Sequence, residues 1–60
     1  MEFQLFLQSV RGEAFRSVYQ SDDVHDCLSY LRLLKQDAEL AGQRWEVRRQ
    51  GRILKFCGVI

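Results

Sequence analysis

The amino-acid sequence predicts a small α+β domain with the element order ββαββ. Residues 1–20 and 43–60 each alternate apolar and polar side chains on either side of a turn, which is typical of a β-hairpin. Residues 21–41 lie between them and repeat apolar side chains at spacings of three and four, which is typical of an amphipathic helix. We therefore expect a four-stranded, mostly antiparallel sheet with one helix packed on one face.

The length of the chain indicates a single domain over residues 1–60. A domain of this size buries only about 60% of the surface that its unfolded chain exposes. The apolar content of 47% is therefore generous. We expect some of these side chains to be covered by another molecule.

The first hairpin is expected to turn near Arg11 and Gly12, and its register has two solutions. An even loop places Phe15 and Tyr19 on the face of the sheet that the helix leaves uncovered. A one-residue bulge would instead move both rings into the core. The even loop is favoured here. It puts the following residues on the uncovered face: Gln4, Phe6, Gln8, Val10, Phe15, Ser17 and Tyr19.

The helix is expected to begin at residues 21–23, because their hydroxyl and carboxylate oxygens can accept bonds from free amide groups. Gly42 suits the left-handed position that often follows the last turn of a helix. The apolar side chains of this segment form one stripe, long enough to cross a sheet: Val24, Cys27, Leu28, Leu31, Leu34, Ala38 and Ala41.

The second hairpin is expected to turn at residues 50–51. This register pairs Glu46 with Lys55 and Trp45 with Phe56. It also places the following side chains on the uncovered face: Arg44, Glu46, Arg48, Ile53, Lys55, Cys57 and Val59. The predicted core of the whole domain is Phe3, Leu5, Leu7, Val18, Leu28, Leu31, Leu34, Trp45, Val47, Leu54 and Phe56.

Bulk composition narrows the class of protein. The chain has no apolar run of the roughly 18 residues that a membrane span needs, and no secretory signal pattern at its start. Two cysteines without such a signal indicate free thiols in a reducing cytoplasm. We expect a cytoplasmic protein of bacterial or phage type, with no membrane association.

Residues suited to catalysis or metal binding are few. His25, the only histidine, lies beside acidic neighbours in the first helical turn, where such a residue is usually solvated. His25, Cys27 and Cys57 lack the spacing of a zinc site, which normally has four ligands. No glycine-rich phosphate loop is present. We therefore expect no enzyme activity, no catalytic, metal or cofactor site, and no small-molecule substrate.

The uncovered face of the sheet is the predicted functional surface. Half of its side chains are apolar, and one helix is the only other layer that this chain can supply. We expect a non-enzymatic protein-binding or regulatory module that forms a homodimer or binds a larger protein there. The predicted contact residues are Phe6, Phe15 and Tyr19 as anchors, with Arg48 and Lys55 at the rim.

A small nucleic-acid-binding protein is the alternative. Aromatic and basic side chains on one sheet face can stack bases and contact phosphates. The candidate contacts are Arg48, Arg49 and Arg52, around the tight second turn. The net charge of +1 is low for such a protein, and the sequence carries no recognised nucleic-acid-binding motif.

Overall fold

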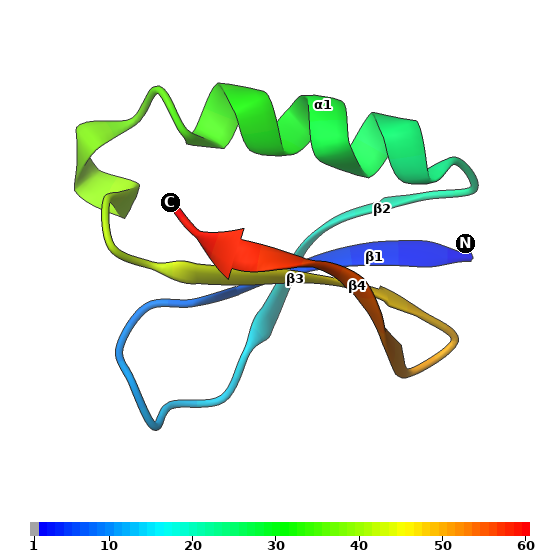
Figure 1. Cartoon of the computed structure of the whole chain (residues 1–60), viewed down its shortest axis with the longest axis horizontal. Helices are drawn as coiled ribbons and strands as arrows, with labels where there is room; N and C mark the ends of the chain where they lie inside the picture. Colours follow the sequence, from blue (N-terminus) through cyan, green and yellow to red (C-terminus); the bar gives the residue numbers. More distant parts are fainter. Residues whose placement is uncertain (1) are drawn as a thin grey trace.

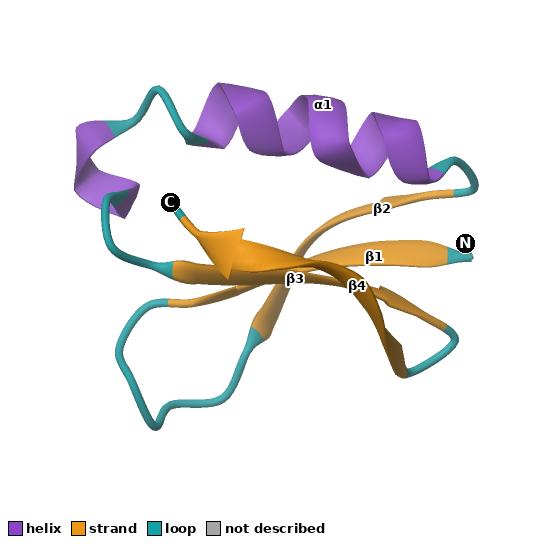
Figure 2. Ribbon diagram, in the orientation of Figure 1, coloured by secondary structure: helices purple, strands orange, loops and turns teal. Residues whose placement is uncertain are grey.

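The structure is a computed structural model that describes residues 2–60, apart from the side chain of Lys55. Its elements are β1 (Phe3–Gln8), β2 (Arg16–Ser21), α1 (Val24–Leu34), a short 3-10 helix η1 (Ala38–Leu40), β3 (Arg44–Arg49) and β4 (Arg52–Val59). The strands form one antiparallel sheet in the order β2-β1-β3-β4. Helix α1 lies across one face of this sheet (Figures 1 and 2), which confirms the predicted ββαββ fold.

Helix α1 is shorter than the sequence predicts. It begins after Asp23, whose side chain accepts a hydrogen bond from the backbone N–H of His25 at 2.9 Å. It ends at Leu34, and the chain then turns into η1, which Asp37 caps in the same way. The prediction of one helix over residues 21–41 is therefore wrong in extent. The apolar spacing continues past Leu34, but Asp37 offers its oxygen to the backbone of a separate turn.

The first hairpin contains a bulge between Leu5 and Phe6, so the favoured even register is wrong for part of β2. Tyr19 pairs with Leu5 and faces α1, where its ring stacks on Tyr30 with centroids 4.5 Å apart and planes 10° apart. Phe15 lies beyond the bulge and stays on the face away from α1, beneath Arg48. The bulge thus moves one of the two rings into the core and leaves the other outside.

The second hairpin turns at residues 50–51 as predicted, with Arg49 opposite Arg52. Gln50 and Gly51 have φ values of 50° and 82°, as a two-residue hairpin turn requires. Further along, the register shifts by two residues, so that Glu46 lies opposite Cys57 and Trp45 lies opposite Gly58. The predicted pairing of Glu46 with Lys55 and of Trp45 with Phe56 is therefore wrong.

Gly58 accommodates Trp45 in this shifted register. A Cβ atom at Gly58 would lie 3.1 Å from Nε1 of Trp45 and 3.3 Å from two carbon atoms of the indole. The indole therefore packs directly on the backbone of β4, at a position where a larger residue would force the ring or the strand to move by a few tenths of an ångström.

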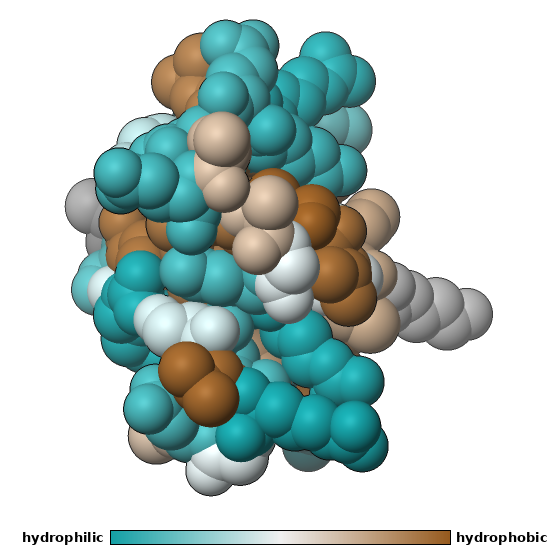
Figure 3. Space-filling view, turned by 90° about the vertical axis from the view of Figure 1, so that its left-hand side faces the viewer, coloured by the Kyte–Doolittle hydropathy of each residue, from teal (hydrophilic) through white to brown (hydrophobic). Residues whose placement is uncertain are grey.

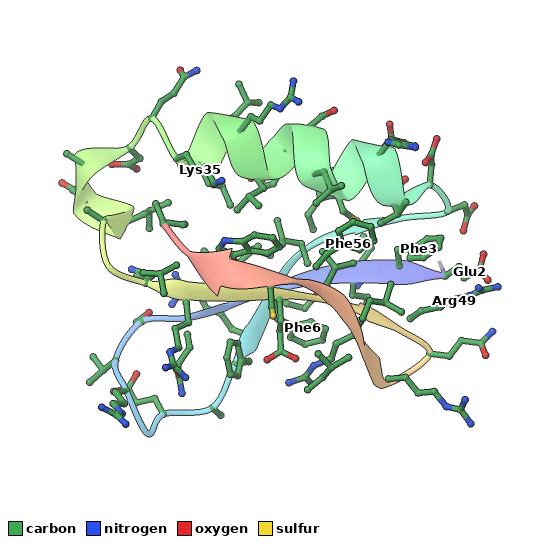
Figure 4. The ribbon with its side chains drawn as sticks, in the orientation of Figure 1. Glu2, Phe3, Phe6, Lys35, Arg49 and Phe56 are labelled. Atoms are coloured by element: carbon green, nitrogen blue, oxygen red, sulfur yellow. The ribbon has the colours of Figure 1, made fainter. Side chains whose placement is uncertain are left out.

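The core lies between α1 and the sheet. Its buried members are Leu5, Leu7, Cys27, Leu31 and Val47. Most of the other predicted core residues pack around them partly buried: Phe3, Val18, Leu28, Leu34, Trp45 and Leu54. Phe56 points toward the helix side (Figure 4) but is 41% exposed, so its assignment to the core is wrong. Helix α1 contacts β1 and β2, and Phe56 lies on the other edge strand.

Candidate functional site

The face of the sheet that points away from α1, here called the back face, carries three rows of side chains. The strand registers place Phe15, Gln8, Arg44 and Val59 in one row, Ser17, Phe6, Glu46 and Cys57 in the next, and Gln4, Arg48 and Ile53 in the third. The β1–β2 loop and the β3–β4 turn both project on this side of the sheet (Figure 1). The back face is therefore bordered by the β1–β2 loop and by the β3–β4 turn.

Arg48 is held at the centre of the back face by three neighbours. The central carbon of its guanidinium lies 4.2 Å from the ring centroid of Phe6 and 5.6 Å from that of Phe15. Its Nε donates a 2.7 Å hydrogen bond to Oε2 of Glu46. Cation–π contacts and a charge-assisted hydrogen bond thus fix the same side chain.

Glu46 is unusually buried for a carboxylate on an uncovered sheet face. It is only 6% exposed, and Arg48 is bound to it. Phe6, Phe15, Glu46 and Arg48 together form a compact cluster on the back face. Arg48 is therefore already ordered before any partner arrives.

A shallow groove of about 450 Å³ lies next to this cluster. Its walls come from the residue that precedes β2 and from β3 and β4: Phe15, Arg44, Trp45, Glu46, Ile53, Cys57, Gly58 and Val59. Ile53 and Val59 are 62% and 59% exposed, although both are large aliphatic side chains. The apolar wall on the β4 side is consequently open to a partner.

The basic residues around the second hairpin do not act together. Arg48 belongs to the back face and is paired with Glu46, whereas Arg49 lies on the helix side and pairs with Glu2 (Figure 4). Arg52 is exposed at the end of the turn. The three predicted nucleic-acid contacts are therefore divided between two faces, and two of the three are already bound to carboxylates.

The predicted protein-contact residues are brought together only in part. Phe6, Phe15 and Arg48 meet in one cluster, as the sequence analysis expected. Tyr19 lies on the opposite face, and the side chain of Lys55 lies outside the described part of the chain. The groove adds residues that were placed on this face but not assigned to the site: Arg44, Ile53, Cys57 and Val59. Their alternation along the two strands was the available signal.

The two cysteines lie in different environments. Cys27 is buried in the core under α1, and burial raises the pKa of its thiol, with Asp26 and Asp23 adding to the effect. Cys57 is exposed on the groove wall. Within residues 2–60 no three histidine, cysteine or acidic side chains cluster so as to hold a metal ion.

Most of the surface seen from the end with η1 and the β1–β2 loop is hydrophilic, and its apolar areas are small and separate (Figure 3). Among the described residues, no helix has the length and apolar character to cross a membrane.

Comparison with known proteins gave no relative: no family model, no curated protein and no solved structure matches the chain. The functional conclusion therefore depends on the geometry of the back face.

Proposed function

We propose that this protein is a non-enzymatic protein-binding module that holds a second copy or a larger protein on its back face. The observation that carries the proposal is the open groove beside the ordered Arg48 cluster, with Ile53 and Val59 more than half exposed on its wall. Contiguous apolar surface of this kind is typical of interaction sites.

Burial of the two aliphatic side chains supplies part of the binding free energy. Fully burying an isoleucine or valine side chain is worth about 1.5–3 kcal/mol. Ile53 and Val59 retain about 60% of their exposure in the free protein. Their burial under a partner therefore contributes roughly 1–2 kcal/mol each.

Arg48 supports the same proposal in a different way. Arginine and aromatic side chains dominate the energetics of protein interfaces, and ordering a long side chain usually opposes binding. Here Phe6, Phe15 and Glu46 already hold the guanidinium in place. A partner that contacts Arg48 avoids most of that ordering cost.

Nucleic-acid binding receives less support. Arg48 is paired with Glu46 and Arg49 with Glu2, so both cations would have to leave a carboxylate to contact phosphate. The face of Phe6 is occupied by the guanidinium of Arg48, so the ring is poorly placed to stack a base.

We also infer a reducing, cytoplasmic setting, in keeping with free thiols at Cys27 and Cys57.

The test compares three forms of the full chain: wild type, the double variant Ile53→Asp/Val59→Asp, and Leu33→Asp as control. Leu33 is 63% exposed on α1, so the control places a charge on an equally exposed aliphatic position of the other face. Circular dichroism first checks that all three forms fold. Each form is then immobilised and exposed to a lysate of the cells that produce the protein. Proteins that are retained are identified, purified and tested again for binding.

The proposal expects a purified partner, or a second copy detected by sedimentation equilibrium, that binds wild type and Leu33→Asp but not the double variant. Equal binding by all three forms, or loss with Leu33→Asp alone, would place the interaction elsewhere and overturn the proposal.

A further inference from the structure

β4 is an edge strand whose open side adjoins the groove. It is last in the strand order and pairs only with β3 among the described residues. Ile60 donates its N–H to Gln43 at 2.9 Å and accepts from Gly42 at 2.8 Å, so its backbone points toward β3. Successive residues of a strand point their N–H and C=O groups to opposite sides. The backbone groups of Val59 and Cys57 therefore point to the open edge.

The same two residues present their side chains to the groove. Cys57 and Val59 both line it, and Ile53 lines it further along β4. A strand added beside β4 would therefore gain backbone hydrogen bonds and contact with the apolar wall at one location. This combination is the basis of peptide recognition by strand addition.

The two edges of the sheet differ in their protection. Both edge strands are irregular, β2 opposite Leu5 and Phe6 and β4 between the residues opposite Glu46 and Arg48, but the residues of β2 are mostly polar. β4 is longer, at eight residues, and exposes Ile53, Phe56 and Val59. Natural proteins normally shield such an edge, because it is a template for pairing with another chain.

Charge indicates what kind of chain would pair there. Residues 44–59 carry five basic side chains and one acidic side chain, Glu46, which is bound to Arg48. Arg44 lines the groove next to Val59, and Arg52 begins β4. Neither forms an ion pair with any described residue. A second copy would bring the same positive charge to this edge, whereas an acidic chain would be attracted to it.

We propose that β4 binds an extended acidic segment of a partner protein as a fifth strand, with apolar side chains of that segment in the groove. This inference rests on the proposed function and names the chemistry of the partner. The glutamates or aspartates of the segment meet Arg44 on the back face near one end of β4, and Arg52, which the register places on the same side as Arg49, near the other end.

The probe is a synthetic peptide matched to the eight residues of β4, with glutamates at both ends and alternating valine and threonine between them. Isothermal titration calorimetry measures its binding to the full chain. One control peptide has lysines in place of the glutamates. A second has methyl groups on alternate backbone nitrogens, which removes the hydrogen-bond donors and leaves the charges.

The acidic peptide is expected to bind one-to-one, and more weakly as salt is raised. Methylation of the backbone nitrogens should weaken binding of the peptide about tenfold, as expected for losing one or two backbone hydrogen bonds. The variant Arg44→Gln/Arg52→Gln should also weaken it, whereas Arg32→Gln on α1 should not. The lysine peptide should show no binding.

Equal binding of the acidic and lysine peptides, or no effect of methylation, would overturn the inference. A dimer in sedimentation equilibrium that excludes the acidic peptide would also overturn it and assign the edge to a second copy. If no peptide binds while a purified partner still distinguishes wild type from Ile53→Asp/Val59→Asp, only this inference fails. If that distinction is also lost, the proposed function fails with it.

Discussion

Substituting Gly58 with alanine should destabilise the protein through a specific collision with Trp45. The new methyl group would lie 3.1 Å from Nε1 of the indole, closer than the 3.4–4 Å of ordinary van der Waals contact. Either the ring or β4 must then move by a few tenths of an ångström. Overpacking of this kind typically costs about 1–3 kcal/mol. A domain of this size has roughly 3–9 kcal/mol of stability, so the loss is easily measured.

The assay is urea unfolding at equilibrium, followed by circular dichroism. Fluorescence is not suitable, because Trp45 is the only tryptophan and one of the backgrounds compared lacks it. The same Gly58→Ala change is also made in a Trp45→Leu background, which removes the colliding ring. The cost of the alanine should be about 1–3 kcal/mol in wild type and should fall below about 0.5 kcal/mol in that background. An equal cost in both backgrounds, or none in either, would refute the packing of Trp45 on Gly58 and with it the β3–β4 register.

Four further predictions concern the cap, the ion pair and the thiols. Asp23→Ala should lower the free energy of unfolding by about 0.5–2 kcal/mol, because it removes the cap of α1; an unchanged urea midpoint would contradict this. Arg48→Met should cost about 1–3 kcal/mol, because it leaves the buried carboxylate of Glu46 without its partner; added stability in urea unfolding would count against that role. Iodoacetamide at mildly alkaline pH should modify Cys57 and spare Cys27, whose pKa burial raises; mass spectrometry showing equal labelling would disprove the assigned burial. The free energy of unfolding should also fall as pH rises past the ordinary thiol value of about 9.0, since unfolded Cys27 ionises first, and Cys27→Ala should remove that slope.

Local sequence signals predicted the order of the elements and the second turn. Gln50 and Gly51 both adopt positive φ, and this turn chemistry alone sets the pairing of Arg49 with Arg52. The acidic start of the helix likewise indicated its first turn, where Asp23 is the cap. These features depend on residues close together in the chain.

The bulges could not be predicted in the same way, because they depend on packing between distant residues. A two-residue shift in β4 keeps the same side chains on each face, so alternation cannot detect it. In the shifted register the indole of Trp45 packs on Gly58, a contact between residues of different strands. In β2 the bulge lets Tyr19 stack on Tyr30 of α1, a contact between residues of different elements.

The same limit applies to the candidate site. Apolar alternation predicted that the back face would bind another molecule and placed Phe6, Phe15 and Arg48 on it. The contacts of Arg48 with both rings, and the burial of Glu46 beside it, depend on side chains that come from β1, from β3 and from the end of the β1–β2 loop. The groove beside them likewise requires the shifted register that brings Cys57 opposite Glu46.

The back face at β4 is the binding surface that we propose. Its most direct test is to follow the backbone amide signals of ¹⁵N-labelled protein by NMR while the acidic peptide is added. Changes should concentrate at residues 53–59 and at Arg44, the amides of Cys57 and Val59 should become protected from hydrogen exchange, and the amides of α1 should stay unchanged. Changes centred on α1, or none at β4 at saturating peptide, would show that β4 is not the binding surface.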